Sequence, residues 1–203
     1  MPDHSKIALL VLAAGGSSRM GVSKQLLPWG KTTLLAHCVA TITKLEHSHQ
    51  FVVLGAEIRK IEKSIAHLPV TILNNESWEQ GLGNSISFGI NKIKSAPANY
   101  QGVLILLADQ PLIDHAYLRS MISLFSDNNS IVASAYVDGK IGVPALFGRH
   151  YFDELSELSG DGGARSVLQA YREVIRLHSE PEKLIDLDTA EEYEALYTTI
   201  HQS

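Results

Sequence analysis

Short apolar segments alternate along the chain with segments whose apolar residues recur every three or four positions. The first kind is predicted to form buried strands, and the second kind helices that turn one face to a core. In the first half, the predicted strands are 7–12, 50–55, 70–73 and 103–108, and the predicted helices are 32–45, 57–66, a segment after Ser85, and 114–125. This alternation predicts an α/β fold with a single, doubly wound, mostly parallel sheet and helices on both faces.

The second half of the chain continues the pattern. The predicted elements are, in order, a strand at 130–135, a turn at 137–144, a strand at 145–147, a helix at 165–171 and a strand at 184–188. Alternation in the last strand places Asp186 and Asp188 on one face. Thr189 and Glu192 fit the capping-box pattern, which predicts that the final helix begins there.

The first predicted strand runs into a glycine-rich segment that also carries two cations. Gly15, Gly16 and Gly21 let backbone N–H groups approach a ligand closely, and Arg19 and Lys24 add positive charge. The glycine spacing matches neither the dinucleotide fingerprint nor the P-loop nor the protein kinase loop. Backbone donors together with two cations predict a cradle for a polyphosphate.

Composition narrows the function further. At 203 residues the chain suits one domain over 1–203, and a net charge of −5 argues against a nucleic-acid partner. Cys38 is the only cysteine, so no disulfide framework or cysteine zinc site is expected, which fits a cytoplasmic protein. The run 7–12 is too short to span a membrane, and no membrane partner is expected.

The segment from Leu12 to Pro28 resembles a known signature, L-A-A-G-x-S-x-R-M-G-x-x-K-x-L-L-P, of nucleotidyltransferases that mature the molybdenum cofactor. It is most similar to the cytidylyltransferases of that group. The resemblance implies a nucleotidyltransferase fold whose N-terminal part binds the nucleotide and whose C-terminal part binds the acceptor. It assigns nucleotide binding to Leu12, Ala13, Ala14, Gly15, Gly16, Ser17, Ser18, Arg19 and Lys24.

A second match begins at Asn75. Together with Trp78, Gly81, Leu82 and Ser85 it fits the family pattern N-x-x-[WY]-x-x-G-[LM]-x-x-S. In the resembled enzymes this segment meets the base and sugar, which implies nucleotide binding by Asn75, Gly81 and Ser85. An ordinary loop before a helix is the alternative.

Asp109 directly follows the most continuously apolar predicted strand. A carboxylate at the carboxyl end of a central strand lies where open α/β sheets bind ligands, and Mg²⁺ on a triphosphate prefers one or two carboxylates. Alternatively, Asp109 starts a turn before Pro111 or caps the next helix. The resemblance implies a Mg²⁺ (or Mn²⁺) site on Asp109 and Asp188, with Asp186 a weaker candidate and helix capping the alternative role for Asp188.

Two further segments resemble the acceptor side of the family. Gly142 and Pro144 flank Val143 where the family usually has G-H-P, and Asp161 and Arg165 fit G-D-x-G-A-R. The resemblance therefore implies acceptor binding by Gly142, Pro144, Asp161 and Arg165. A cap at Asp161 and a surface cation at Arg165 are the alternatives.

Taken together, the resemblance implies transfer of CMP from CTP to Mo-molybdopterin, giving molybdopterin cytosine dinucleotide and pyrophosphate. Arg19, Lys24 and Asp109 are the expected catalytic residues, and a recipient molybdoenzyme is a possible partner. CTP is favoured because Ala13-Ala14-Gly15 reads A-A-G, whereas guanylyl relatives have A-G-G.

The Val143 side chain cannot donate a hydrogen bond, so its departure from the family's G-H-P pattern leaves other functions open. These are guanylyl transfer or another nucleotidyltransferase acting on a sugar phosphate or phospholactate, and a molybdopterin-binding chaperone without chemistry.

Overall fold

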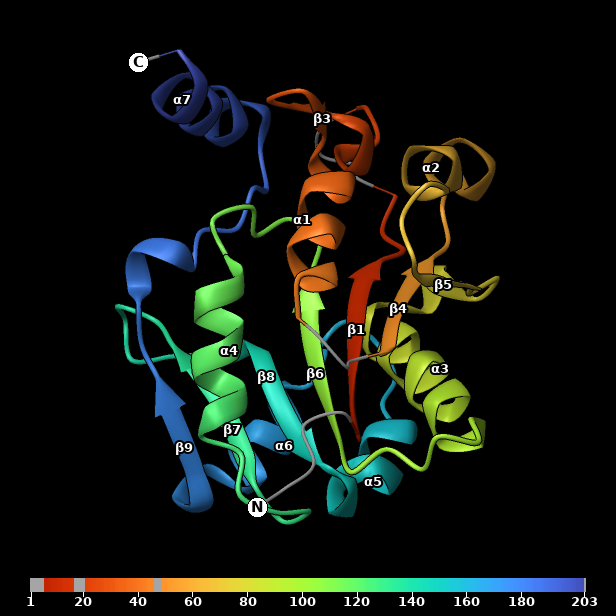
Figure 1. Ribbon diagram of the computed structural model, residues 1–203, viewed down its shortest axis with the longest axis vertical. Coiled ribbons are helices and arrows are strands. Elements are labelled where there is room, and N and C mark those ends of the chain that lie inside the picture. Colours follow the sequence, from red (N-terminus) through yellow and green to blue (C-terminus); the bar gives the residue numbers. More distant parts are fainter. Residues whose placement is uncertain (1–5, 17–20, 46–48, 203) are drawn as a thin grey trace.

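A computed structural model describes residues 6–16, 21–45 and 49–202. Within these residues a seven-stranded sheet runs through the molecule in the order β5-β4-β1-β6-β8-β7-β9 (Figure 1). Its strands are β1 (Ile7–Ala13), β4 (His49–Leu54), β5 (Thr71–Asn74), β6 (Gly102–Leu107), β7 (Ile131–Ala135), β8 (Ile141–Gly148) and β9 (Ile175–His178). Only β8 runs antiparallel to its neighbours, β6 and β7, so the predicted mostly parallel sheet is confirmed.

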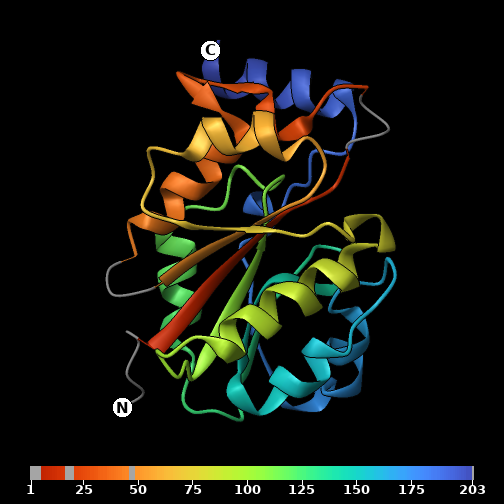
Figure 2. The same ribbon diagram turned by 90° about the vertical axis from the view of Figure 1, so that its right-hand side faces the viewer.

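Helices cover both faces of this sheet (Figure 2). They are α1 (Leu34–Thr43), α2 (Ile58–Ile65), α3 (Leu82–Ser95), α4 (His115–Ser123), α5 (Phe152–Ser156), α6 (Arg165–Ala170) and α7 (Ala190–His201). Alternate side chains of β1 decide which core each joins: Leu9 and Val11 pack with α1, α2 and α4, whereas Leu10 and Leu12 pack with α3, α5 and α6. Each such side chain stabilises the fold by roughly 1.5–3 kcal/mol through burial, which explains why the central strand is apolar on both faces.

Three helices begin at side-chain caps, of which the sequence predicted only the capping box before α7. The Thr33 hydroxyl accepts from the Ala36 N–H, and the Asp114 carboxylate accepts from the Tyr117 N–H at 2.8 Å. Thr189 and Glu192 form the full capping box at the start of α7. These caps satisfy N–H groups that a helix leaves unpaired, so each helix begins where its sequence places the acceptor.

A third, smaller core joins the C-terminal helix to the N-terminal half. The short strands β2 (Pro28–Trp29) and β3 (Thr32–Thr33) form an antiparallel pair, and Trp29 packs with Leu34, Leu187 and Tyr193. The Tyr193 hydroxyl donates to the Pro28 carbonyl oxygen at 2.7 Å. Figure 2 shows α7 above the α1 and α2 layer, at the end of the molecule opposite the start of β1. This packing fixes the segment that precedes α7.

Two sequence predictions for the second half of the chain are wrong. Residues 184–188 form no strand, because Leu184 and Leu187 are the buried positions while Ile185 is 38% exposed. The buried apolar residues there lie three positions apart rather than two. The Leu187 N–H donates to the Asp109 carbonyl oxygen at 3.0 Å and not to a neighbouring strand. The predicted turn at 137–144 ends early, since β8 begins at Ile141 and its register against β7 shifts after Ala133. Strand β9 was not predicted.

The described residues contain the seven α-helices α1 to α7. No helix among them combines the length and apolar character needed to cross a membrane.

Candidate active site

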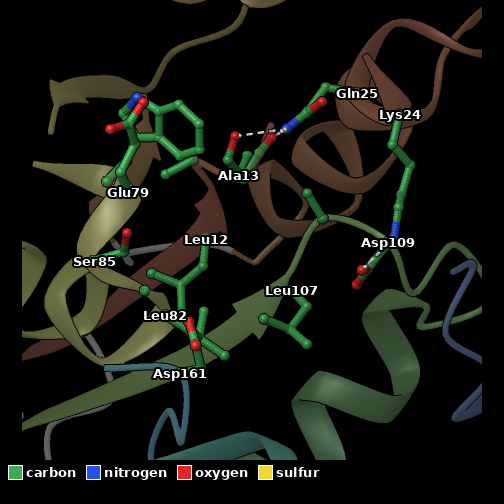
Figure 3. A pocket seen from close by; sticks show the side chains of 15 residues that line it. Leu12, Ala13, Lys24, Gln25, Glu79, Leu82, Ser85, Leu107, Asp109 and Asp161 are labelled. Atoms are coloured by element: carbon green, nitrogen blue, oxygen red, sulfur yellow. Dashed lines mark hydrogen bonds and ion pairs between the residues drawn. The ribbon is translucent and has the colours of Figure 1, made fainter. Parts of the chain in front are cut away.

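A first cavity of about 380 Å³ lies at the carboxyl ends of β1 and β6 (Figure 3). Residues 12–15 form one wall and residues 107–109 a second. The third wall comes from the predicted base and sugar segment, with Trp78, Gly81 and Ser85. Ligands of open α/β sheets bind beyond the carboxyl ends of the strands, so the cavity has the expected position.

Glycines keep the backbone beside this cavity accessible. A Cβ atom at Gly55 would lie 2.5 Å from the Trp78 side chain, and one at Gly16 would lie 2.9 Å from it, so the indole requires both glycines. A Cβ atom at Gly15 would meet nothing within 4 Å. Gly15 therefore borders open space, as expected where a backbone approaches a ligand.

Lys24 connects two carboxylates that are far apart in the sequence. Its Nζ atom lies 2.9 Å from Asp109 Oδ2 and 3.3 Å from Asp188 Oδ1. Burial by itself would lower the pKa of Lys24, but attraction to Asp109 and Asp188 outweighs burial and raises the pKa above its ordinary value. Lys24 therefore stays protonated through the neutral range and offers a fixed positive charge beside the cavity.

The same two carboxylates fit a divalent cation. Asp109 Oδ1 is buried and has no hydrogen-bond partner in the part of the chain that the structure describes. A buried carboxylate oxygen without a donor is costly unless a ligand satisfies it, and Mg²⁺ and Mn²⁺ prefer oxygen ligands. No cluster of three or more His, Cys, Asp or Glu residues suited to a metal occurs among the described residues. Two carboxylates are what a cation shared with substrate phosphates needs.

Gln110, the residue after Asp109, bonds to two side chains that come from other segments. Its Nε2 atom donates to Asp186 Oδ1 and to the Tyr136 hydroxyl, each at 2.8 Å, and the Tyr136 hydroxyl donates to the Val143 carbonyl oxygen at 2.6 Å. Burial, with the nearby charge of Asp109, raises the pKa of Asp186. Asp186 is thus held by Gln110, whereas Asp188 is held by Lys24.

A second cavity, of about 580 Å³, adjoins the first. The two share Leu12, Leu82 and Leu107 as lining residues, and Asp186 lines the second cavity where Asp109 lines the first. Arg165 and Arg172 place two cations on one wall of the second cavity. It therefore suits an anionic ligand with apolar portions.

The remaining predicted site residues lie in different places. Asn75 is buried outside the linings of both cavities, and its Nδ2 atom donates to Ser85 Oγ at 3.1 Å, so it supports a lining residue. Gly142 lines the second cavity. Pro144 does not line it, and the Pro144 carbonyl oxygen accepts from the Ser134 hydroxyl. Asp161 lines the first cavity and not the second. Ser17, Ser18 and Arg19 lie outside the described residues.

Sequence reasoning missed several lining residues. Gln25 lines the first cavity, and Tyr136 and Arg172 line the second. Arg172 carries only a weak signal, a second arginine seven positions after Arg165, because α6 ends at Ala170 and Arg172 begins the separate 3-10 turn η5 (Arg172–Val174). Gln25 and Tyr136 carry none, because isolated polar residues in a sequence do not show which carbonyl groups they will meet.

Comparison with known proteins identifies a family match over most of the chain. Residues 9–174 match the profile of the family described as MobA-like NTP transferase domain. The matched range contains the walls of the first cavity and ends before Asp186 and Asp188.

Individual relatives agree with this match. Purine catabolism protein PucB of Bacillus subtilis (strain 168) is 31% identical over 193 residues, covering 90% of this chain and 92% of that protein. A solved structure of the homologue of Mycobacterium tuberculosis Rv0371c from Mycobacterium sp. strain JC1 is 30% identical, with a TM-score of 0.80 over 96% of both chains. The manganese complex of Rv0371c from Mycobacterium tuberculosis H37Rv is 27% identical, with a TM-score of 0.79 over 96% of this chain and 100% of that one.

Proposed function

The chain belongs to the family of MobA-like NTP transferase domains, and from that premise we propose that it transfers CMP from CTP to Mo-molybdopterin. The products are molybdopterin cytosine dinucleotide and pyrophosphate. The acceptor phosphate attacks the α-phosphorus in line, a new P–O bond forms, and the bond to the leaving pyrophosphate breaks.

One observation carries this proposal: the two cavities share a wall, and each has a carboxylate in its own lining. Both are lined by Leu12, Leu82 and Leu107, with Asp109 on the first side and Asp186 on the second. A triphosphate in the first cavity and a phosphomonoester in the second would bring their reacting atoms together at this junction. Positioning of the two reactants, together with electrostatic stabilisation, supplies most of the catalysis in phosphoryl transfer.

The residues of the first cavity have separate tasks. Backbone N–H groups near Gly15 would bind the triphosphate, and Lys24 would pair with its oxygens and stabilise charge on the leaving pyrophosphate. Arg19 is proposed to assist in the same role. Asp109 and Asp188 would hold Mg²⁺ or Mn²⁺, which when bound neutralises phosphate charge. The unpartnered Asp109 Oδ1 supports this assignment.

The acceptor assignment rests on the second cavity. Arg165 would attract an anionic acceptor, and Gly142 lines the same cavity. Apolar side chains of that cavity, among them Ile86 and Leu168, would pack against the flat faces of a pterin ring. Val143 lines the cavity at the position where the resembled family pattern has histidine, and this departure favours the second candidate, nucleotidyl transfer to a different phosphomonoester.

The test is pyrophosphate release with Mg²⁺ and molybdenum-loaded molybdopterin, with CTP, GTP, ATP and UTP offered separately. Release with CTP alone is expected. Release with GTP would keep the mechanism and overturn the base preference, which rests on Ala14. If no nucleotide releases pyrophosphate with molybdopterin but one does so with a sugar phosphate or phospholactate, the acceptor belongs to that class. Tight pterin binding without turnover of any acceptor would favour a chaperone.

A further inference from the structure

Gln25 is one of the few polar side chains that the fold buries beside the first cavity. It is 6% exposed and lies in the short 3-10 turn η2 (Lys24–Leu26). Its Nε2 atom donates to the carbonyl oxygens of Ala13 at 2.9 Å and Gly15 at 2.8 Å (Figure 3). The signature that the chain resembles leaves this position open, so no role has been assigned to Gln25.

These two bonds act on the wall that would face a triphosphate. A carbonyl oxygen carries partial negative charge, which repels phosphate oxygens unless a donor compensates it. Gln25 supplies such a donor to Ala13 and Gly15, and the carbonyl oxygen of Ala14 accepts from the Ala56 N–H at 3.1 Å. Three consecutive carbonyl groups are thus bound by protein donors, so this wall has its shape before a ligand arrives.

The same turn also reaches the carboxylates. Lys24, the residue before Gln25, points away from Ala13 toward Asp109 (Figure 3). It bonds to both Asp109 and Asp188. Backbone bonds from the Leu26 N–H to the Ser23 oxygen and from the Leu27 N–H to the Lys24 oxygen, at 2.9 and 3.1 Å, hold the turn. Two adjacent side chains therefore connect the glycine-rich wall to the carboxylate pair.

We propose that Gln25 is a positioning residue for nucleotide binding, acting through the backbone of Ala13 and Gly15. The inference rests on the proposed function, because it requires that the first cavity bind a nucleoside triphosphate. Gln25 touches no reacting atom; it holds the wall at a fixed position relative to Lys24. Its loss lowers nucleotide affinity more than it lowers the stability of the fold.

The test compares Gln25→Met, which keeps the length but removes the donor, and Gln25→Glu, which adds a charge facing two carbonyl groups. Thr41→Val is the matched control, since Thr41 is also buried and donates to one carbonyl group, in α1. Equilibrium binding of CTP, or of GTP if the wild type binds it more tightly, is measured with and without Mg²⁺, alongside thermal unfolding. We expect Kd to rise at least about tenfold in Gln25→Met and further in Gln25→Glu, with Thr41→Val unchanged.

A second measurement separates positioning from general loosening. In the pyrophosphate-release assay, KM for the nucleotide should rise in Gln25→Met while KM for the acceptor stays within about twofold. Nucleotide affinity within about twofold of wild type would overturn the role of Gln25 and leave the proposed function intact. An equal loss in Thr41→Val would also overturn it. A wild-type protein that binds no nucleoside triphosphate would overturn the proposed function and this inference together.

Discussion

The two cavities differ in what forms their walls. The first is lined by consecutive residues at the end of β1, Leu12 to Gly15, with Gln25 and Lys24 contributed by one short turn. The second is lined by residues from separate elements, including β8 and α6, with Arg165 and Arg172 among them. Backbone N–H groups recognise phosphate in the same way whatever the rest of the ligand, whereas side chains recognise a particular body.

This difference explains where the chain keeps the family pattern and where it departs from it. On the side of the first cavity, Leu12 to Gly15 follow the signature residue by residue. On the side of the second, Val143 replaces the expected histidine. We call the first cavity the donor side, because it would bind the nucleotide, and the second cavity the acceptor side. A substitution on one side should then affect one substrate more than the other.

The largest effect is expected from Asp109→Asn, in the lining of the first cavity. The variant keeps the shape of the side chain but removes the charge that would hold a cation, so turnover should fall by about a thousandfold. The fold should stay intact, although the loss of the ion pair between Asp109 Oδ2 and Lys24 should lower the melting temperature.

Asp153→Asn is the control for this substitution, since Asp153 is an exposed acid paired with Lys94. Near-normal turnover in Asp109→Asn would remove this residue from the mechanism.

Lys24→Met should weaken the donor side more than the acceptor side. The substitution removes a buried charge next to the first cavity, and kcat/KM for the nucleotide should fall by about a hundredfold. It also leaves Asp109 and Asp188 without the cation that now connects them, so adding Mg²⁺ should raise the melting temperature of the variant more than that of the wild type. The effect is checked by steady-state kinetics with each substrate varied, and by unfolding with and without Mg²⁺.

Lys94→Met, which removes a lysine far from both cavities, should leave kcat/KM unchanged. An equal rise in KM for both substrates in Lys24→Met would contradict the division between the sides.

Arg165→Gln and Arg172→Gln test the acceptor side. Each removes a cation that lines only the second cavity, so KM for the acceptor should rise by about tenfold. The nucleotide Kd should stay within about twofold in both variants. Arg176→Gln in β9 is the control, because Arg176 donates to the Leu124 carbonyl oxygen outside both cavities. A weaker nucleotide Kd in either test variant would show that the second cavity does not serve the acceptor alone.

The smallest effect concerns stability and pH at Asp186. Because its pKa is raised on folding, by burial and by Asp109, its contribution to stability is complete below the unfolded pKa and is lost as pH rises through the folded pKa. Asp186→Asn should therefore melt a few degrees higher than wild type at neutral pH and equally at low pH. Thermal unfolding across the acidic to neutral range measures this.

Asp138→Asn provides a control of opposite sign. Its hydrogen bond from Lys140 lowers the pKa of Asp138, so its contribution is present above the unfolded pKa and is lost as pH falls through the folded pKa. This variant should gain no stability at neutral pH. Equal melting temperatures for Asp186→Asn and wild type at neutral pH would show that Asp186 is not held in an unfavourable charged state.

Sequence patterns predicted the features that depend on neighbouring residues. The apolar run 103–108 indicated a central strand and placed Asp109 at its carboxyl end, and Thr189 with Glu192 marked the start of α7. The glycine-rich segment after β1 indicated a phosphate site by its residue types alone. Each of these signals works because hydrogen bonding and side-chain alternation over a few residues already favour one local structure.

Only the tertiary structure decided the contacts between distant segments. Lys24 meets Asp109 and Asp188 across 85 and 164 positions, and Asp188 arrives by a loop that alternation had wrongly indicated as a strand. Gln25 finds its two carbonyl partners only after β1 and η2 pack together. Such contacts depend on the summed burial of the whole core, so no short stretch of sequence specifies them. The residue types alone predicted the chemistry of individual segments, whereas the junction of the two cavities exists only in the folded chain.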